Sequence, residues 1–126
     1  MNFFISDELQ QLYTDVALGV LHYRANVQKS TPALLELFAK TISELQERCT
    51  MDDIAHIPQI AATRNAYKAL GKSPHEYRNA AEAMLRRVVK GSGLYHINNI
   101  VEINNLVSIF EGSIFRGSDK IVVFAK

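Results

Sequence analysis

The chain has 126 residues, of which 48% are hydrophobic, 21% charged and 9% aromatic, with a net charge of +1. This composition is typical of a globular domain and argues against intrinsic disorder, and a chain of this length buries enough surface to form a single domain over residues 1–126. The single cysteine, Cys49, excludes an intramolecular disulfide and a cysteine-based zinc site. The sequence contains no stretch typical of a transmembrane helix or a secretory signal, so we expect a cytoplasmic protein without membrane contact.

The net charge hides an uneven distribution along the chain. Residues 1–56 carry a net charge of −4, residues 57–90 carry +5, and residues 91–126 carry zero. A basic segment of this kind can bind a polyanion such as a nucleic acid. The alternative is a solvated surface that is basic by chance.

The first predicted element is a β-strand over residues 16–27, which read VALGVLHYRANV. Both sets of alternating positions begin apolar and become polar at the end, which is the pattern of a strand covered on both faces. Residues 121–124 predict a short terminal strand, and residues 114 and 115 are a further candidate. These segments together predict a small sheet.

Four helices are predicted from capping residues, from prolines at first helical positions and from glycines at helix ends. Their expected ranges are residues 31 to about 50, 58 to 70, 73 to 90, and 98 or 99 to 112. Asp52 or Asp53 is expected to cap the element that follows the first helix. The sequence therefore predicts an α+β domain in which about four helices pack on a small sheet.

The basic segment supplies the candidate nucleic-acid-binding residues, which are Arg64, Lys68, Lys72, Arg86, Arg87 and Lys90. The first three are spaced i, i+4, i+8 and share one helical face if the helix continues past Gly71. Cations without an intervening carboxylate suit a phosphate backbone. Glu82 lies four residues from both Arg78 and Arg86, so we expect part of this surface to be paired internally. A lysine-rich solvent face is the alternative.

The last predicted helix carries four asparagines within eight residues: Asn98, Asn99, Asn104 and Asn105. Asparagine costs about half a kcal/mol relative to alanine inside a helix, and only the first two can be explained as caps. Asn98, Glu102 and Asn105 share one face, which could bind a small polar ligand or hold a buried hydrogen-bond network. The alternative is that the amides tie the helix to a neighbouring loop.

The apolar residues of the same helix are expected to form its buried stripe, namely Ile100, Ile103, Leu106, Val107 and Phe110. No histidine lies at metal-binding spacing from a second ligand, and neither a phosphate-binding glycine loop nor a nucleophile elbow is present in the sequence. Cys49 is predicted to pack at a helix end and not to act as a nucleophile. We therefore expect no metal and no cofactor.

Residues 63–109 resemble the B3/B4 domain, which occurs in the beta subunit of phenylalanyl-tRNA synthetase and in small stand-alone proteins of bacteria and archaea. The motifs are RNAYKALGKSP from residue 64, LRR from residue 85 and, most specifically, INNIVEINNLVS from residue 97. The stand-alone branch is the better match, and the resemblance covers about residues 14–119. Domains of this family continue through several more strands, so the chain resembles the first part of such a domain.

The resemblance implies an editing-like function. In the synthetase, this domain hydrolyses tyrosine wrongly esterified to the phenylalanine tRNA, in a pocket between sheet and helices. A polar Thr-Asn pair of the family falls on Asn104 and Asn105, and a family aspartate falls on Asp119. Arg116 stands where the synthetase has a histidine. The resemblance thus implies a module that binds aminoacyl-tRNA or its aminoacyl group and is at most a weak or inactive deacylase, without ligase activity.

The candidate ligand-binding residues are accordingly Asn98, Asn104, Asn105 and Asp119. Asn98, Asn104 and Asn105 could donate hydrogen bonds to an ester oxyanion, and Glu102 is a weak candidate for orienting water. Two other functions stay open: a non-enzymatic module that binds an amino acid or a small polar ligand, and a truncated remnant that acts through protein assembly. An incomplete sheet leaves an edge that pairs with another chain, so we also expect a homodimer.

Overall fold

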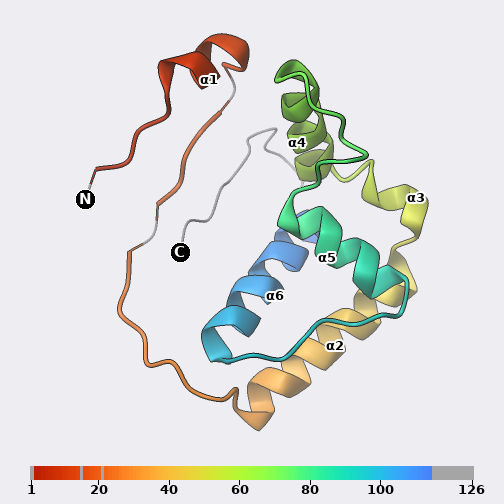
Figure 1. Cartoon of the computed structure of the whole chain (residues 1–126). Coiled ribbons are helices and arrows are strands. Elements are labelled where there is room, and N and C mark those ends of the chain that lie inside the picture. The colour runs from red at the N-terminus through yellow and green to blue at the C-terminus, as the bar shows by residue number, and fades with distance from the viewer. Residues whose placement is uncertain (1, 15, 21, 115–126) are drawn as a thin grey trace.

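The computed structural model describes residues 2–14, 16–20 and 22–114, which form a helical fold (Figure 1). The helices are α1 (Asp7–Leu12), α2 (Pro32–Arg48), α3 (Met51–Ile54), α4 (Pro58–Ala69), α5 (Ala80–Val89) and α6 (Asn99–Ile114). None of the helices in this part of the chain is long and apolar enough to cross a membrane.

The prediction of an α+β domain is wrong, because the described residues contain no β-sheet. Val16 makes one isolated bridge, and residues 17–20 and 22–27 of the predicted strand have neither helix nor strand structure and are mostly exposed. A strand that is apolar on both faces needs neighbouring strands to pair with, and the described residues supply none. The predicted strand at 121–124 lies outside the described residues, and Ile114 is the last residue of α6 instead of a strand residue.

The predicted limits of α2 and α4 are confirmed. The Thr31 hydroxyl accepts a hydrogen bond from the Leu34 N–H at 3.3 Å, and a proline occupies the first turn of each helix. Gly71, with φ of +73°, lets the chain reverse after α4, so that the Lys72 N–H donates to the Tyr67 carbonyl at 2.8 Å. A residue with a side chain would be strained in this left-handed conformation.

The short helix α3 is capped by two residues. The Thr50 hydroxyl accepts from the Asp53 N–H, while the Asp53 carboxylate accepts from the Thr50 N–H at 2.8 Å. Hydrogen bonds from Thr50 lower the pKa of Asp53, so this contribution to stability is present above the pKa of an unfolded aspartate and is lost as the pH falls through the lowered value. Asp53 therefore takes part in the cap, but Thr50 is the N-cap residue.

The helix expected to have Ser73 as its N-cap and Pro74 as its first residue begins six residues later than predicted, at Ala80. Residues 73–77 instead form a turn, in which the Tyr77 N–H donates to the Ser73 carbonyl at 2.9 Å. The N-cap is Asn79, whose side-chain oxygen accepts from the Glu82 N–H at 2.7 Å. Both segments carry a capping signal, and the second one forms the helix that holds Glu82 in the interior.

Helix α6 is the centre of the packing, because it contacts α2, α4 and α5 (Figure 1). The core is formed by apolar side chains from α2 to α6, namely Phe38, Leu45, Ile54, Ile60, Leu85, Val88, Leu106 and Ile109. Burial of such side chains removes their apolar surface from water and is the main stabilising contribution to the fold.

The predicted stripe of α6 is only partly correct. Of its members only Leu106 belongs to the core, whereas Ile103, Val107 and Phe110 are 39–48% exposed. The buried face runs instead through Glu102, Leu106 and Ile109, at spacing i, i+4, i+7. The helix has apolar residues on both sides, because Ile103, Val107 and Phe110 repeat the same spacing one residue further on. The helix also continues past Gly112, where it was predicted to stop.

Candidate nucleic-acid interface

The basic segment is organised around one buried carboxylate. The Oε1 atom of Glu82 accepts hydrogen bonds from Nη1 of Arg64 at 2.8 Å and from Nε of Arg86 at 3.0 Å. The Nε atom of Arg78 lies 3.9 Å from the same oxygen. The expected pairing of Glu82 with Arg78 and Arg86 is thus present, and Arg64 from α4 is an additional partner. A buried carboxylate is stabilised only when it is paired in this way.

This pairing changes the role of two predicted binding residues. The side chains of Arg64 and Arg86 are only 16% and 23% exposed, and both are directed to Glu82. Their contacts join α4 to α5, as does the hydrogen bond from the Asn79 amide to the Thr63 hydroxyl at 3.1 Å. Arg64 and Arg86 therefore fix the junction of the two helices, and the more exposed cations are left to face a ligand.

The exposed cations lie on either side of this junction. Lys68 lies near the end of α4 and Lys90 is the residue after α5, and both are exposed. Figure 1 shows α4 and α5 pointing away from each other, so their far ends are separated. Lys72 is also exposed, but it follows the reversal at Gly71 and does not continue the α4 face. The i, i+4, i+8 arrangement that requires a continuous helix is therefore wrong.

Two of the cations lie against tyrosine rings. Nζ of Lys72 is 5.1 Å from the centre of the Tyr77 ring, and the guanidinium carbon of Arg87 is 5.0 Å from the centre of the Tyr95 ring. Cations at this distance are attracted to the face of an aromatic ring. No periodic pattern in the sequence indicates these pairs, although both tyrosines lie within or next to the basic segment.

Asn98 and Asn99 serve as structural groups at the start of α6. The Asn98 side-chain oxygen accepts from the Val101 N–H at 2.9 Å, so Asn98 caps the helix. The Asn99 side chain accepts from the Gln28 N–H at 3.0 Å and donates to the Asn26 carbonyl at 2.9 Å. Asn99 thus ties the helix to the N-terminal segment, which is the structural alternative to a ligand-binding role for these amides.

Asn104 and Asn105 are half-buried, and their side-chain amides form no hydrogen bond with any other part of the chain that the structure describes. Only the backbone carbonyl of Asn104 is engaged, by the Ser108 hydroxyl at 2.8 Å. Among the four asparagines at and within α6, these two therefore have side-chain amides not engaged by the described residues. Asp119, the fourth predicted ligand-binding residue, lies outside the described residues.

Glu102 is buried and holds the segment before α6. Its Oε1 atom accepts from the Ile97 N–H at 2.9 Å and lies 3.2 Å from Nδ1 of His96, whose ring packs 5.1 Å from that of Phe38. The buried Oε2 atom has no hydrogen-bond partner among the described residues. Glu102 is thus directed toward the loop and the core, away from a position in which it could orient water for Asn104 or Asn105.

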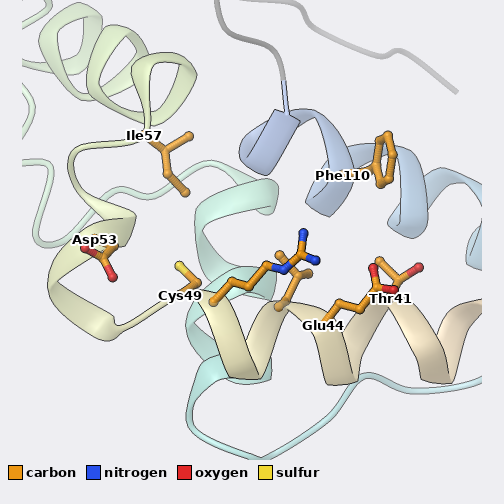
Figure 2. A pocket seen from close by; sticks show the side chains of 8 residues that line it. Thr41, Glu44, Cys49, Asp53, Ile57 and Phe110 are labelled. Carbon is orange, nitrogen blue, oxygen red and sulfur yellow. The ribbon is translucent and has the colours of Figure 1, made fainter.

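A small groove lies between α2, α3 and α6 (Figure 2). Its volume of about 260 Å³ is below that of a typical ligand pocket. None of Asn98, Asn104 and Asn105 lines this groove. The described lining residues are Thr41, Glu44, Leu45, Arg48, Cys49, Asp53, Ile57 and Phe110.

Cys49 lies in this groove, where it caps the end of α2. Burial raises the pKa of the thiol, and the Asp53 carboxylate adds to the effect. Both causes disfavour the thiolate, which is the nucleophilic form, so the environment of Cys49 is that of a packing residue. Over the described residues, histidines, cysteines and carboxylates form no group that could hold a metal ion.

Comparison of the chain with protein-family models, with curated proteins and with solved structures finds no match. The likeness to the B3/B4 domain is therefore carried by the sequence motifs alone. The function has to be inferred from the surface that the described residues form.

Because Glu82 joins α4 to α5, we expect even a conservative substitution of this residue to lower the stability of the fold strongly. Glu82→Gln removes the charge that pairs Arg64 and Arg86, and we expect it to lower the free energy of unfolding by about 2–3 kcal/mol. Urea unfolding followed by circular dichroism measures this change. Glu76→Gln is the control, because Glu76 is exposed, and should change stability by less than about 0.5 kcal/mol. Equal effects of the two substitutions would contradict a structural role for Glu82.

The hydrogen bonds of Asn99 are expected to slow proteolysis of the N-terminal segment. Asn99→Ala removes two side-chain hydrogen bonds to residues 26 and 28, and we expect faster trypsin cleavage after Arg24, which mass spectrometry of the products detects. Asn104→Ala removes an amide without such contacts and serves as the control. Unchanged cleavage in the Asn99 variant would show that these hydrogen bonds do not hold the segment.

Proposed function

We propose that the chain binds RNA through the exposed cations around the α4–α5 junction. The observation that supports this proposal is that Glu82 is buried in ion pairs and does not offset the charge of the surface. Within residues 57–90 the only carboxylates are Glu76 and Glu82, and Glu82 is buried against Arg64 and Arg86. Glu76 is therefore the one carboxylate left to oppose the exposed cations of this segment.

The arrangement of the cations favours an extended ligand over a compact one. Lys68 and Lys72 lie toward the far end of α4, whereas Arg87 and Lys90 lie at the far end of α5. Helices of twelve and ten residues are about 18 Å and 15 Å long, so these two groups are too far apart for one small anion. A phosphate backbone presents a charge at every nucleotide and can contact both groups.

The resemblance of the basic segment to the B3/B4 domain makes aminoacyl-tRNA the ligand that we propose within this class. Asn104 and Asn105, with free amide groups in the described structure, are the proposed contacts for the aminoacyl group. We propose binding without efficient hydrolysis, because the neighbouring carboxylate of Glu102 is buried and already accepts hydrogen bonds. A general base must reach the proton that it removes.

The lysines provide the direct test. We expect the triple variant Lys68→Gln, Lys72→Gln, Lys90→Gln to bind tRNA more weakly, because each lost phosphate contact removes counterion release. The plot of log affinity against log salt concentration should become shallower by roughly 2–3 for three contacts. Fluorescence anisotropy of labelled tRNA at several salt concentrations measures both effects.

Lys40→Gln is the matched control, since Lys40 is exposed on α2 and lies 4.0 Å from the Glu44 carboxylate outside the basic segment. It should leave the salt dependence unchanged. Equal salt dependence of the wild type and the triple variant would contradict the RNA-binding proposal.

Self-association is a second candidate function, favoured by the exposed stripe of Ile103, Val107 and Phe110 on α6. A pairing of sheet edges is ruled out for the described residues, since they form no sheet. The stripe contains no ionisable residue, so it is complementary to a second copy of itself across a two-fold axis. We propose a homodimer in which the α6 stripes face each other.

Sedimentation over a range of concentrations tests this dimer. Val107→Lys places a charge in the middle of the stripe and should give a monomer at concentrations where the wild type is a dimer. Leu12→Lys, at an exposed apolar position on α1, is the control and should leave the assembly unchanged. A wild-type chain that stays monomeric at high micromolar concentration would overturn the proposal.

A further inference from the structure

Two exposed tyrosine rings lie within or next to the basic segment, one before α5 and one after it. Tyr77 is 47% exposed and precedes α5, whereas Tyr95 is 74% exposed and follows it. Large aromatic side chains lose hydrophobic stabilisation when they face water, so a pair of them among cations calls for an explanation. Nucleobases stack on exposed aromatic rings, and this stacking tolerates any base because every base has a flat face.

The local structure holds each ring in place. Nε of Arg87 donates to the Gly93 carbonyl at 3.2 Å, which fixes the guanidinium that lies against Tyr95. The backbone of the Tyr77 turn is fixed by its hydrogen bond to Ser73, and Lys72 lies against the ring. Rings that are ordered before binding lose little conformational entropy when a base stacks on them.

The two cation–tyrosine pairs also provide both kinds of contact that bind single-stranded RNA, namely base stacking and phosphate binding. Each ring offers a surface for a base, and each cation beside it offers a charge for a phosphate. In a duplex the bases are stacked on one another and their faces are inaccessible, so a duplex would use the cations alone. Tyr77 and Tyr95 are separated by α5, which is about 15 Å long, so they would contact different nucleotides.

We infer that the RNA bound by this surface is single-stranded, with one base stacked on Tyr77 and another on Tyr95. This inference rests on the proposed function and names the form of RNA that the site takes. Lys72 and Arg87 hold the rings from one side and attract the strand, while the exposed face of each ring receives a base.

Binding of a single-stranded oligoadenylate of about twelve nucleotides tests the inference, with an RNA duplex of the same length as the comparison. We expect the full-length protein to bind the single strand more tightly. Tyr95→Ala and Tyr77→Ala should each weaken single-strand binding by about 5- to 150-fold and leave duplex binding unchanged. Tyr95→Phe should retain the wild-type affinity, because it keeps the ring.

Tyr23→Ala is the matched control, since Tyr23 is 58% exposed in the N-terminal segment, away from the cation pairs. It should not change the affinity. The chain has five tyrosines and no tryptophan, so tyrosine fluorescence offers a second readout. Stacked bases should quench this fluorescence, and the quenching should decrease in the Tyr77 and Tyr95 alanine variants. Circular dichroism confirms that each variant keeps its helix content.

The outcomes separate this inference from the function on which it rests. If the lysine variants lose affinity but the tyrosine variants do not, the surface binds the backbone only and the stacking inference is wrong. Tighter binding of the duplex than of the single strand would also overturn it. If the wild type binds tRNA but not the single-stranded oligoadenylate, only the stacking inference is wrong. If it binds none of the three RNAs, the proposed function fails, and the stacking inference fails with it.

Discussion

The ion pairs of Glu82 are the interaction on which the arrangement of α4 and α5 depends. Glu82 sits in the first turn of α5, where a negative charge is favoured by the helix dipole, and its carboxylate reaches across to Arg64 on α4. Removal of either partner leaves a charge in a site with little access to water. These contacts place one of the two carboxylates of the basic segment in the interior. The structural role of Glu82 therefore also leaves the surface of this segment more positively charged.

Helix α6 has two apolar faces that lie next to each other around the helix, one buried and one partly exposed. The buried face, through Leu106 and Ile109, meets α2, α4 and α5. Glu102 lies on this face and fixes the preceding loop through the Ile97 N–H. The adjacent face, through Ile103, Val107 and Phe110, is 39–48% exposed, and Phe110 also lines the groove beside α2. The core thus packs on one side of this helix, and the proposed homodimer would use the partly exposed side.

The sequence predicted the limits of a helix well where capping residues, prolines or glycines at its ends set them. It predicted them less well where a contact with a residue distant in the sequence sets them. Thr31, Pro58 and Gly71 set the limits of α2 and α4 through bonds within a few residues. The start of α5 was misplaced because Ser73 and Asn79 both carry capping signals, and only the contact of Glu82 with Arg64 distinguishes them. The predicted strand failed for a similar reason, because pairing partners are not visible in a strand's own pattern.

The site was predicted in part. The charge pattern located the basic segment, and the pairing of Glu82 with Arg86 followed from helical spacing. Spacing within one helix could not show that Arg64, eighteen residues away, shares the same carboxylate. The cation–tyrosine pairs were missed because Tyr77 and Tyr95 lie in connections without helical periodicity. The roles of Asn98 and Asn99 were among the alternatives considered, but only the structure assigns one of them to each residue.

The attachment of the N-terminal segment to Asn99 has a consequence for how the chain folds during synthesis. The Gln28 N–H and the Asn99 side chain are 71 positions apart, so residues 22–28 have no partner for these bonds until α6 has been made. At typical translation speeds this interval is about 4 to 14 seconds. Throughout that time the contacts that hold Asn26 and Gln28 to α6 are absent, and Val27 between them, which is 68% exposed even in the folded chain, is open to other proteins. A chaperone that recognises short apolar segments would therefore compete with α6 for this part of the nascent chain.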